Sequence, residues 1–289
     1  MIPLTTPVHF SLPFDFESME NRFASIGSCF SERAVELLSD GGFQCCSNPN
    51  GIVYNPVSIV SSVNHIVNRI PYTEMDLFFF NGKYHSREHH GSFSAETMEE
   101  TLQNIETART EFSEFLQTPC PVALTFGTAV VFRENRTGKI VANCHKVPGT
   151  EFSRELLSIQ DCCQAVCSAV EQLCAAGEHP VLLSVSPVRH HPGDPVLNSR
   201  SKSILIEACH QAAEQLAGCC AYFPAYELLH DELRDYRFYK DDLIHPSPVA
   251  ERFILESFLK KCYPVSAEQI LTTADSTRKR NAHVPGGFK

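Results

Sequence analysis

Residues 24–38 read ASIGSCFSERAVELL, and this stretch decides the fold that we predict. A run of small and apolar residues ends at a glycine, and a helical pattern follows it. The run predicts a buried strand at residues 22–28, and the pattern predicts a helix at residues 32–38. Cys29 would lie just before the helix N-terminus, where free N–H groups and the helix dipole favour a thiolate and lower the thiol pKa.

Outward from this stretch, short β-branched runs alternate with helical segments along the chain. This alternation is typical of a parallel sheet with helices on both faces, an α/β fold. We expect five core strands, at residues 22–28, 43–47, 122–126, 181–185 and 219–223. We expect the main helices at residues 32–38, 56–69, 152–176, 201–217 and 247–262.

Two segments interrupt the alternation, and each predicts a β-hairpin insertion. Residues 77–93 carry Asn81-Gly82 as a turn between apolar runs. Residues 130–141, VVFRENRTGKIV, carry turn residues that include Gly138. An acidic helix is expected at residues 94–117.

The length of the chain, 289 residues, suits one α/β domain with a common core. We therefore expect a single domain over residues 1–270. The end of the chain is polar, basic and rich in glycine and proline, so residues 271–289 are expected to form a disordered tail.

The charge pattern argues against two classes of partner. The formal net charge is −10, and no segment before the tail concentrates lysine and arginine, so neither nucleic acid nor an anionic membrane is expected to bind. The first residues lack a basic region and are broken by prolines, which disfavours a signal peptide. We therefore expect a soluble, cytoplasmic protein.

Thirteen cysteines raise the question of disulfides or zinc. Their number is odd and no C-x-x-C pair occurs, so neither is predicted, and no metal or cofactor is expected. Cys163, Cys167 and Cys174 lie at helical spacing, as small core residues do. Only Cys29 and Cys144 lie in contexts that suggest chemistry.

A second motif lies near the end of the predicted domain, where FYKDDLIHPS places Asp242 and His245 three residues apart. Residues at this spacing meet on one helical turn. Asp242 would orient the imidazole, and the imidazole would take the proton of a nucleophile, as in hydrolytic triads. Taken alone, the pair has another explanation: Asp242 caps the following turn, and His245 is a surface residue. Since ligands collect at the carboxyl ends of parallel strands, we expect Cys29 and this pair to meet there.

The chain resembles the GSCFA family, a group similar to the SGNH (GDSL-type) hydrolases. The resemblance rests on the Asp242/His245 block and on eight further motifs. These are GSCF (27–30), NPNGIVYNP (48–56), TFGTA (125–129), NCHK (143–146), SPVRH (186–190), SK (201–202), YFPAYE (222–227) and LRDYRFY (233–239). It implies an SGNH-hydrolase-like fold, a three-layer α/β/α flavodoxin-like arrangement with a parallel five-stranded sheet and hairpin insertions.

The resemblance also implies roles for individual residues. Cys29 falls where SGNH enzymes have the nucleophilic serine, with Ser28 as the alternative nucleophile. The oxyanion hole of these enzymes uses the nucleophile's own N–H, a glycine N–H and an asparagine side chain. Gly51 is the candidate glycine. The usual asparagine is absent after the third strand, so Asn143 is the candidate amide, although it is equally read as a turn residue.

Basic groups in the other motifs are candidates for substrate binding, and convergence of two or three would favour a substrate with phosphate or carboxylate. They are His90, His145, Lys146, Arg189, Lys202, Arg234 and Arg237. The alternative is that Arg234 or Arg237 forms structural ion pairs with nearby carboxylates, which we expect for at least one of them. His85, His89 and His90 form a cluster without carboxylate or cysteine ligands at metal spacing, so a metal is not predicted there.

Three functions from different classes follow from these residues. The leading one is hydrolysis or transfer of an acyl group from a small-molecule or carbohydrate-type ester through a Cys29 thioester. The second is a ligand-binding module on a catalytically inactive hydrolase scaffold. The third is a redox-responsive thiol protein in which Cys29 is oxidised, with Cys144 as a partner. Substrate, acyl acceptor and oligomeric state do not follow from the sequence.

Overall fold

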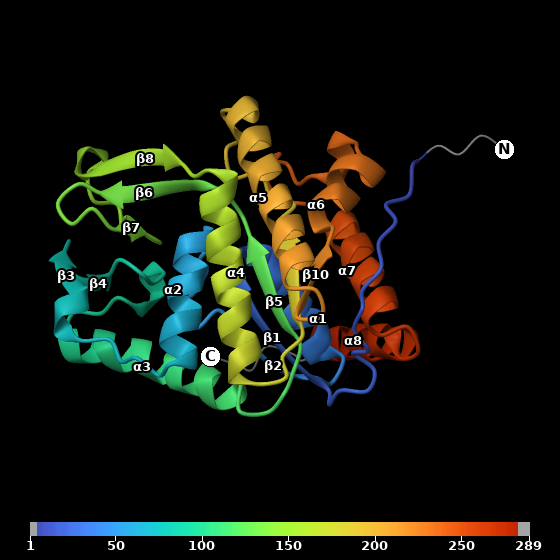
Figure 1. The fold of residues 1–289 in the computed structure, drawn as a ribbon. Helices are drawn as coiled ribbons and strands as arrows, with labels where there is room; N and C mark the ends of the chain where they lie inside the picture. The colour runs from blue at the N-terminus through green and yellow to red at the C-terminus, as the bar shows by residue number, and fades with distance from the viewer. Residues whose placement is uncertain (1–4, 283–289) are drawn as a thin grey trace.

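The centre of the molecule is a parallel sheet in the strand order β10-β9-β5-β1-β2 (Figure 1). The structure is a computed structural model and describes residues 5–282. The strands are β1 (Arg22–Gly27), β2 (Gln44–Ser47), β5 (Val122–Phe126), β9 (Val181–Val185) and β10 (Cys220–Phe223). Numbered along the chain, these core strands lie in the flavodoxin-like order 2-1-3-4-5. The five predicted strands and the predicted fold class are confirmed.

Alternation of side chains along the strands divides the core into two apolar layers. In β1, Ala24 and Ile26 face one layer and Phe23 faces the other, and all three are buried. The first layer is covered by α2 (Pro56–Val67), α3 (Met98–Phe115), α4 (Ile159–Ala176) and α5 (Pro195–Gln215). The second is covered by α1 (Cys29–Asp40), α7 (Pro248–Cys262) and α8 (Ala267–Ala282).

Two predicted helices have different starts, and capping residues explain both. The helix predicted from residue 152 begins at Ile159, because the Ser158 side chain caps the backbone N–H of Asp161. The helix predicted from residue 201 begins at Pro195, with the Asp194 side chain accepting from Leu197 N–H.

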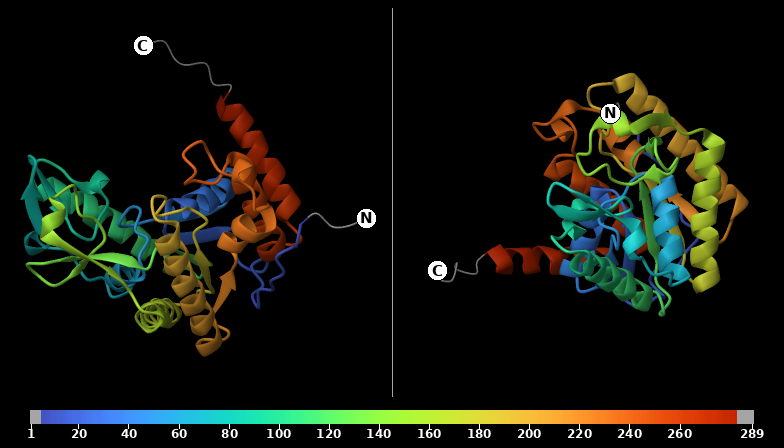
Figure 2. Two further views of the ribbon diagram at one scale, coloured as in Figure 1. Left: turned by 90° about the horizontal axis from the view of Figure 1, so that it is seen from above. Right: turned by 90° about the vertical axis from the view of Figure 1, so that its left-hand side faces the viewer.

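An insertion lobe carries the remaining strands (Figure 2). The first hairpin pairs β3 (Leu77–Phe80) with β4 (Lys83–Ser86) through the predicted Asn81-Gly82 turn. The second pairs β6 (Val130–Glu134) with β7 (Ile140–Val141). Both predicted hairpins are confirmed. Sequence analysis missed β8 (Phe152–Leu156), which pairs with β6 and occupies what we expected to be the first turns of α4.

The end of the described chain corrects one prediction. Residues 271–282 were expected to be disordered, but they are part of α8, which packs Ile270 and Ala274 against the layer of α1 and α7. Burial of this narrow apolar face stabilises a helix whose composition is otherwise polar. Residues 283–289 of the predicted tail lie outside the described residues.

The short helix α6 (Ala225–Glu227) follows β10. Within residues 5–282, no helix has the length and apolar character needed to cross a bilayer.

Candidate active site

The turn between β1 and α1 places Cys29 at the carboxyl edge of the sheet. Gly27 ends β1 with φ +148°, and its N–H donates to Asn48 Oδ1 at 2.8 Å. Asn48 Nδ2 donates in turn to Glu32 Oε1 at 3.0 Å, which ties the end of β2 to the first turn of α1. Cys29 is the first residue of α1 and lies at the β1/β5 switch point, where open α/β sheets bind ligands.

Asp242 and His245 form the predicted pair, on a loop before α7 and not on a helical turn. Asp242 Oδ2 lies 2.8 Å from His245 Nδ1, and Asp242 Oδ1 accepts from the N–H groups of Ile244 and His245. These hydrogen bonds lower the pKa of Asp242 to about 2, so it is ionised near neutral pH. In the neutral ring the carboxylate fixes the proton on Nδ1 and leaves Nε2 free as a base.

Cys29, Asp242 and His245 line one cavity of about 240 Å³, which we call the Cys29 cavity. Its other walls are Phe30, Arg33, Val188, Lys240, Pro246 and Glu251. We expected the sulfur and the imidazole to be within hydrogen-bonding reach, but no hydrogen bond joins these two described side chains. The exposed loop around Leu243, which has φ +55°, carries the histidine at the cavity rim. Catalytic hydrogen bonds are often long in unliganded sites and tighten with substrate.

The Cys29 thiol differs from the expected low-pKa thiolate. Burial raises its pKa, and the Glu32 carboxylate raises it further. The Arg33 guanidinium and the Cys29 N–H act in the opposite direction but are outweighed. The helix N-terminus alone therefore does not ionise this cysteine, and the side chain is a neutral thiol near neutral pH.

This raised pKa makes a testable prediction about alkylation. Since the thiolate is the reactive form, the rate of Cys29 modification by iodoacetamide should keep rising as the pH increases above 9. Peptide mass spectrometry separates Cys29 from the other cysteines, and Cys29→Ala provides the background. A rate that levels off below pH 8 would instead indicate a stabilised thiolate.

The two groups that were expected to donate to an oxyanion make other contacts. The Gly51 N–H donates to Asn48 O at 2.7 Å within its own turn, and a Cβ at Gly51 would lie 2.4 Å from His90 Cβ. Asn143 accepts the His145 N–H at 2.8 Å and lines a different cavity. The expected contributions of Gly51 and Asn143 are thus not present in this geometry. Within the described chain, the N–H groups of Cys29 and Phe30 at the start of α1 have no backbone acceptor.

Lys202 was expected to contact substrate, but it is only 1% exposed. Its Nζ donates to Gly127 O at 2.8 Å and Ser186 O at 2.6 Å, which lie just beyond the ends of β5 and β9. Burial lowers the pKa of this lysine to about 7. Lys202 therefore fixes the two strand ends beside the site and cannot reach a ligand.

The predicted arginines also lie outside the Cys29 cavity. The Arg189 guanidinium stacks on Tyr239 at 4.2 Å, and the backbone N–H of Arg189 donates to Ile244 O at 3.0 Å, so this residue supports the loop that carries His245. Arg237 is exposed and pairs with Asp235 at 3.7 Å, which confirms the alternative of a structural ion pair. Arg234 is exposed and has φ +54° at the end of a helical turn.

A second cavity of about 560 Å³, which we call the outer cavity, brings together the other predicted residues. His90, Asn143, His145 and Lys146 line it, as does Cys144. Burial lowers the pKa of His145 to about 4, so this ring is neutral near neutral pH. Cys29 and Cys144 are both free thiols.

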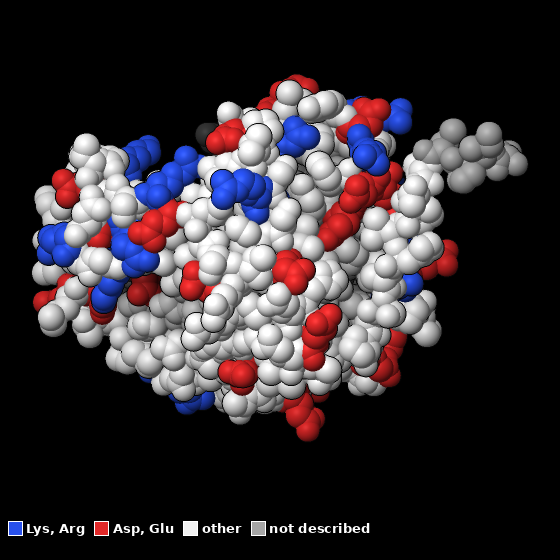
Figure 3. Space-filling view, turned by 45° about the horizontal axis from the view of Figure 1, so that its top comes forward, with Lys and Arg blue, Asp and Glu red and all other residues white. Residues whose placement is uncertain are grey.

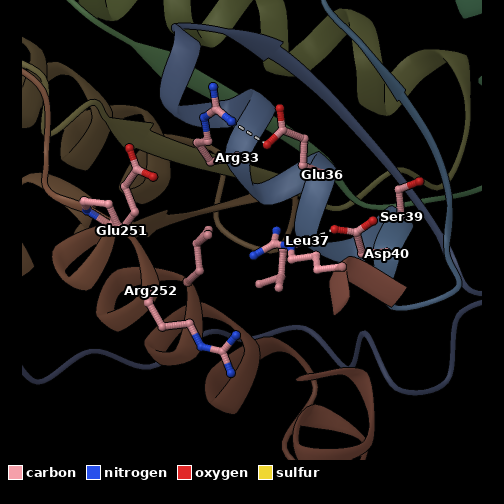
Figure 4. Close-up of a pocket in the computed structure, with 10 residues that line it drawn as sticks. Arg33, Glu36, Leu37, Ser39, Asp40, Glu251 and Arg252 are labelled. Atoms are coloured by element: carbon pink, nitrogen blue, oxygen red, sulfur yellow. Dashed lines mark hydrogen bonds and ion pairs between the residues drawn. The ribbon is translucent and has the colours of Figure 1, made fainter. Parts of the chain in front are cut away.

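A third hollow lies beside the Cys29 cavity and shares Arg33 and Glu251 with it (Figure 4). Two ion pairs form within it: Arg33 with Glu36 at 2.6 Å, and Asp40 with Arg278 at 2.7 Å. Glu251 and Arg252 pair with side chains outside the hollow, so it presents little free charge to a ligand.

Tyr54 and His190 lie in the motifs NPNGIVYNP and SPVRH, and no role was predicted for either residue. Their rings pack at 5.1 Å, and a Cβ at Gly127 would lie 2.8 Å from Tyr54 Cβ and 2.4 Å from His190 Nε2. Both therefore stand over the end of β5. The glycine that follows this strand was the available signal, because it marks a close approach by other groups.

Comparison with known proteins gives one match. The GSCFA family model matches residues 22–258, a region that runs from β1 into α7 and includes Cys29, Asp242 and His245. No curated protein matches the chain. No solved structure matches it either. Because the family model covers most of the sequence, the chain belongs to the GSCFA family.

Proposed function

We propose that the protein is an SGNH-like hydrolase or acyltransferase that forms a thioester between Cys29 and the acyl group of an ester. The single observation that carries the proposal is that Cys29 shares a cavity with a hydrogen-bonded Asp242–His245 pair. A nucleophile, a base and a carboxylate that orients the base are the parts of a hydrolytic triad. The resemblance to SGNH hydrolases supports the same assignment of roles to Cys29, His245 and Asp242.

The neutral Cys29 thiol requires a base in the first step. His245 Nε2 takes the Sγ proton as the sulfur attacks the ester carbonyl carbon, and the carbonyl π electrons move to oxygen. The N–H groups at the start of α1 stabilise this oxyanion. Its collapse breaks the bond to the alcohol oxygen, which takes the proton from the imidazolium. Water or a second alcohol, deprotonated by His245, then attacks the carbonyl carbon of the thioester. The C–S bond breaks, and the imidazolium returns the proton to the Cys29 sulfur.

Intact-mass analysis after incubation with 4-nitrophenyl acetate tests the proposal. We expect one acetyl group on Cys29 of the parent, with a rate that falls about 100- to 1000-fold in His245→Ala, because the general base is lost. His210→Ala is the matched control, since His210 is exposed on α5 and packs on Tyr222. Acetylation of Cys29 at the same rate in parent and His245→Ala would contradict the triad and favour a ligand-binding module.

A further inference from the structure

The outer cavity is larger than the Cys29 cavity. Three tyrosine or phenylalanine rings line it, those of Tyr54, Phe132 and Phe152, and the first two belong to residues that are 37% and 41% exposed. Exposed rings at the wall of a cavity are suited to stacking with a flat or cyclic ligand. The Cys29 cavity is smaller and has Phe30, Val188 and Pro246 in its wall, which suits a short acyl group.

Charge distinguishes the outer cavity from the rest of the molecule. Although the chain has a formal net charge of −10, none of the described residues that line this cavity carries a carboxylate. Lys146 contributes a positive charge at its wall, and Asn143 has a side-chain amide whose NH₂ group remains available. In Figure 3, lysine and arginine side chains lie on the insertion lobe at the left, interspersed with carboxylates, and others lie toward the upper right. The cavity thus favours an anionic ligand.

The backbone holds Lys146 in an unusual conformation. His145 and Lys146 have φ values of +52° and +59°, and the turn is closed by the Val147 N–H donating to Cys144 O at 3.0 Å. His145 Nε2 also bonds Ser86 O at 2.7 Å, which ties the turn to β4. Left-handed backbone at two successive residues with side chains is uncommon and persists only where the surroundings enforce it.

Tyr54 relates the outer cavity to the strand ends beside Cys29. Its carbonyl accepts the Gly127 N–H at 2.7 Å, so the loop after β2 reaches across the end of β1, where Cys29 lies, to the end of β5. The Tyr54 side chain lines the outer cavity. Burial raises the pKa of Tyr54, and the charges of the Cys144 and Cys29 thiolates would raise it further, so its hydroxyl stays protonated near neutral pH.

We infer that the outer cavity binds the alcohol part of the ester substrate and, through Lys146, selects alcohols that carry a carboxylate or phosphate group. The rings hold the body of the alcohol, and the ester carbonyl extends past Tyr54 toward the Cys29 sulfur. This inference rests on the proposed function for the position of the reacting bond. The anion site itself stands on the geometry of the cavity.

Binding of the free alcohol tests the anion site without catalysis. Calorimetric titration with 3-hydroxybenzoate, and in a second arm with phenyl phosphate, distinguishes carboxylate from phosphate. We expect Lys146→Gln to weaken binding of the preferred anion about tenfold, as loss of a hydrogen bond to a charged group does. Lys83→Gln, an exposed lysine on β4 that does not line the cavity, should bind as the parent does, and so should Cys29→Ala. Equal affinities in Lys146→Gln and parent would overturn the inference.

Acetyl transfer then tests the link to the nucleophile. Cys29 should be acetylated faster by 3-acetoxybenzoate than by phenyl acetate, and Lys146→Gln should lose about tenfold of that preference. Acetylation without any preference that depends on Lys146 would overturn the inference and leave the proposed function standing. Binding that depends on Lys146 without acetylation of Cys29 would remove the proposed function and retain the anion site.

Discussion

Cys29→Ala is expected to reduce hydrolysis of 4-nitrophenyl acetate by at least about 1000-fold, to the background given by the other nucleophiles of the chain. In the proposed mechanism the sulfur is the atom that forms the thioester, and no other thiol or hydroxyl lines the Cys29 cavity among the described residues. Steady-state rates, together with intact mass at short times, measure the loss of turnover and of the acyl adduct in one preparation.

Ser28→Ala is the matched control for this prediction. Ser28 is fully buried and its hydroxyl has no hydrogen-bond partner in the described structure, so it is held away from the Cys29 cavity. Activity within about threefold of the parent is expected, because removal of an unpaired buried hydroxyl leaves the packing nearly unchanged. An adduct that disappears in Ser28→Ala and persists in Cys29→Ala would reverse the assignment of the nucleophile.

Gly27→Ala is expected to lower the free energy of unfolding by about 4 kcal/mol, through backbone strain and a steric clash together. Gly27 has φ +148°, and an added Cβ would lie 2.2 Å from Thr125 O, a backbone atom of the neighbouring strand β5. Neither atom can yield without moving β1 or β5. Equilibrium urea unfolding, with the slope checked against that of the parent, measures the loss.

Gly82→Ala separates the two causes. Gly82 has φ +79°, but an added Cβ would meet nothing within 4 Å, so only the backbone strain remains, about 1 kcal/mol. A loss in Gly27→Ala no greater than in Gly82→Ala would contradict close packing between the ends of β1 and β5. The same packing sets the position of Cys29, two residues further on.

The strands and helices of the core could be predicted because burial on both faces of the sheet requires apolar runs that are visible within a few residues of the sequence. Near-continuous apolar runs such as 122–126 and 181–185 are required of strands covered by helices on both sides, and they occur as such in the sequence. The errors fell where the pattern was weak. The β8 segment FSREL adds a partly exposed strand to β6, and α8 depends on a narrow apolar face for its burial.

The part of the site that depends on local spacing was predicted, and the part that depends on distant segments was not. The Asp242–His245 pair depends on a short loop, and its hydrogen bond follows from local spacing. The roles expected of Gly51, Lys202 and Arg237 depended on where distant segments turn their side chains. Those directions follow from packing partners such as His90 against Gly51 and the carbonyl of Ser186 against Lys202.

By itself the sequence determined the order of strands and helices, the two hairpin turns and the presence of a thiol, a carboxylate and an imidazole in recognisable motifs, because each depends on residues within a few positions of one another. Only the tertiary structure decided that Cys29 is a half-buried neutral thiol, that Lys202 is enclosed, and that Tyr54 lines the outer cavity. Desolvation and side-chain direction depend on atoms that the fold brings together from distant positions in the chain, and no local pattern encodes them.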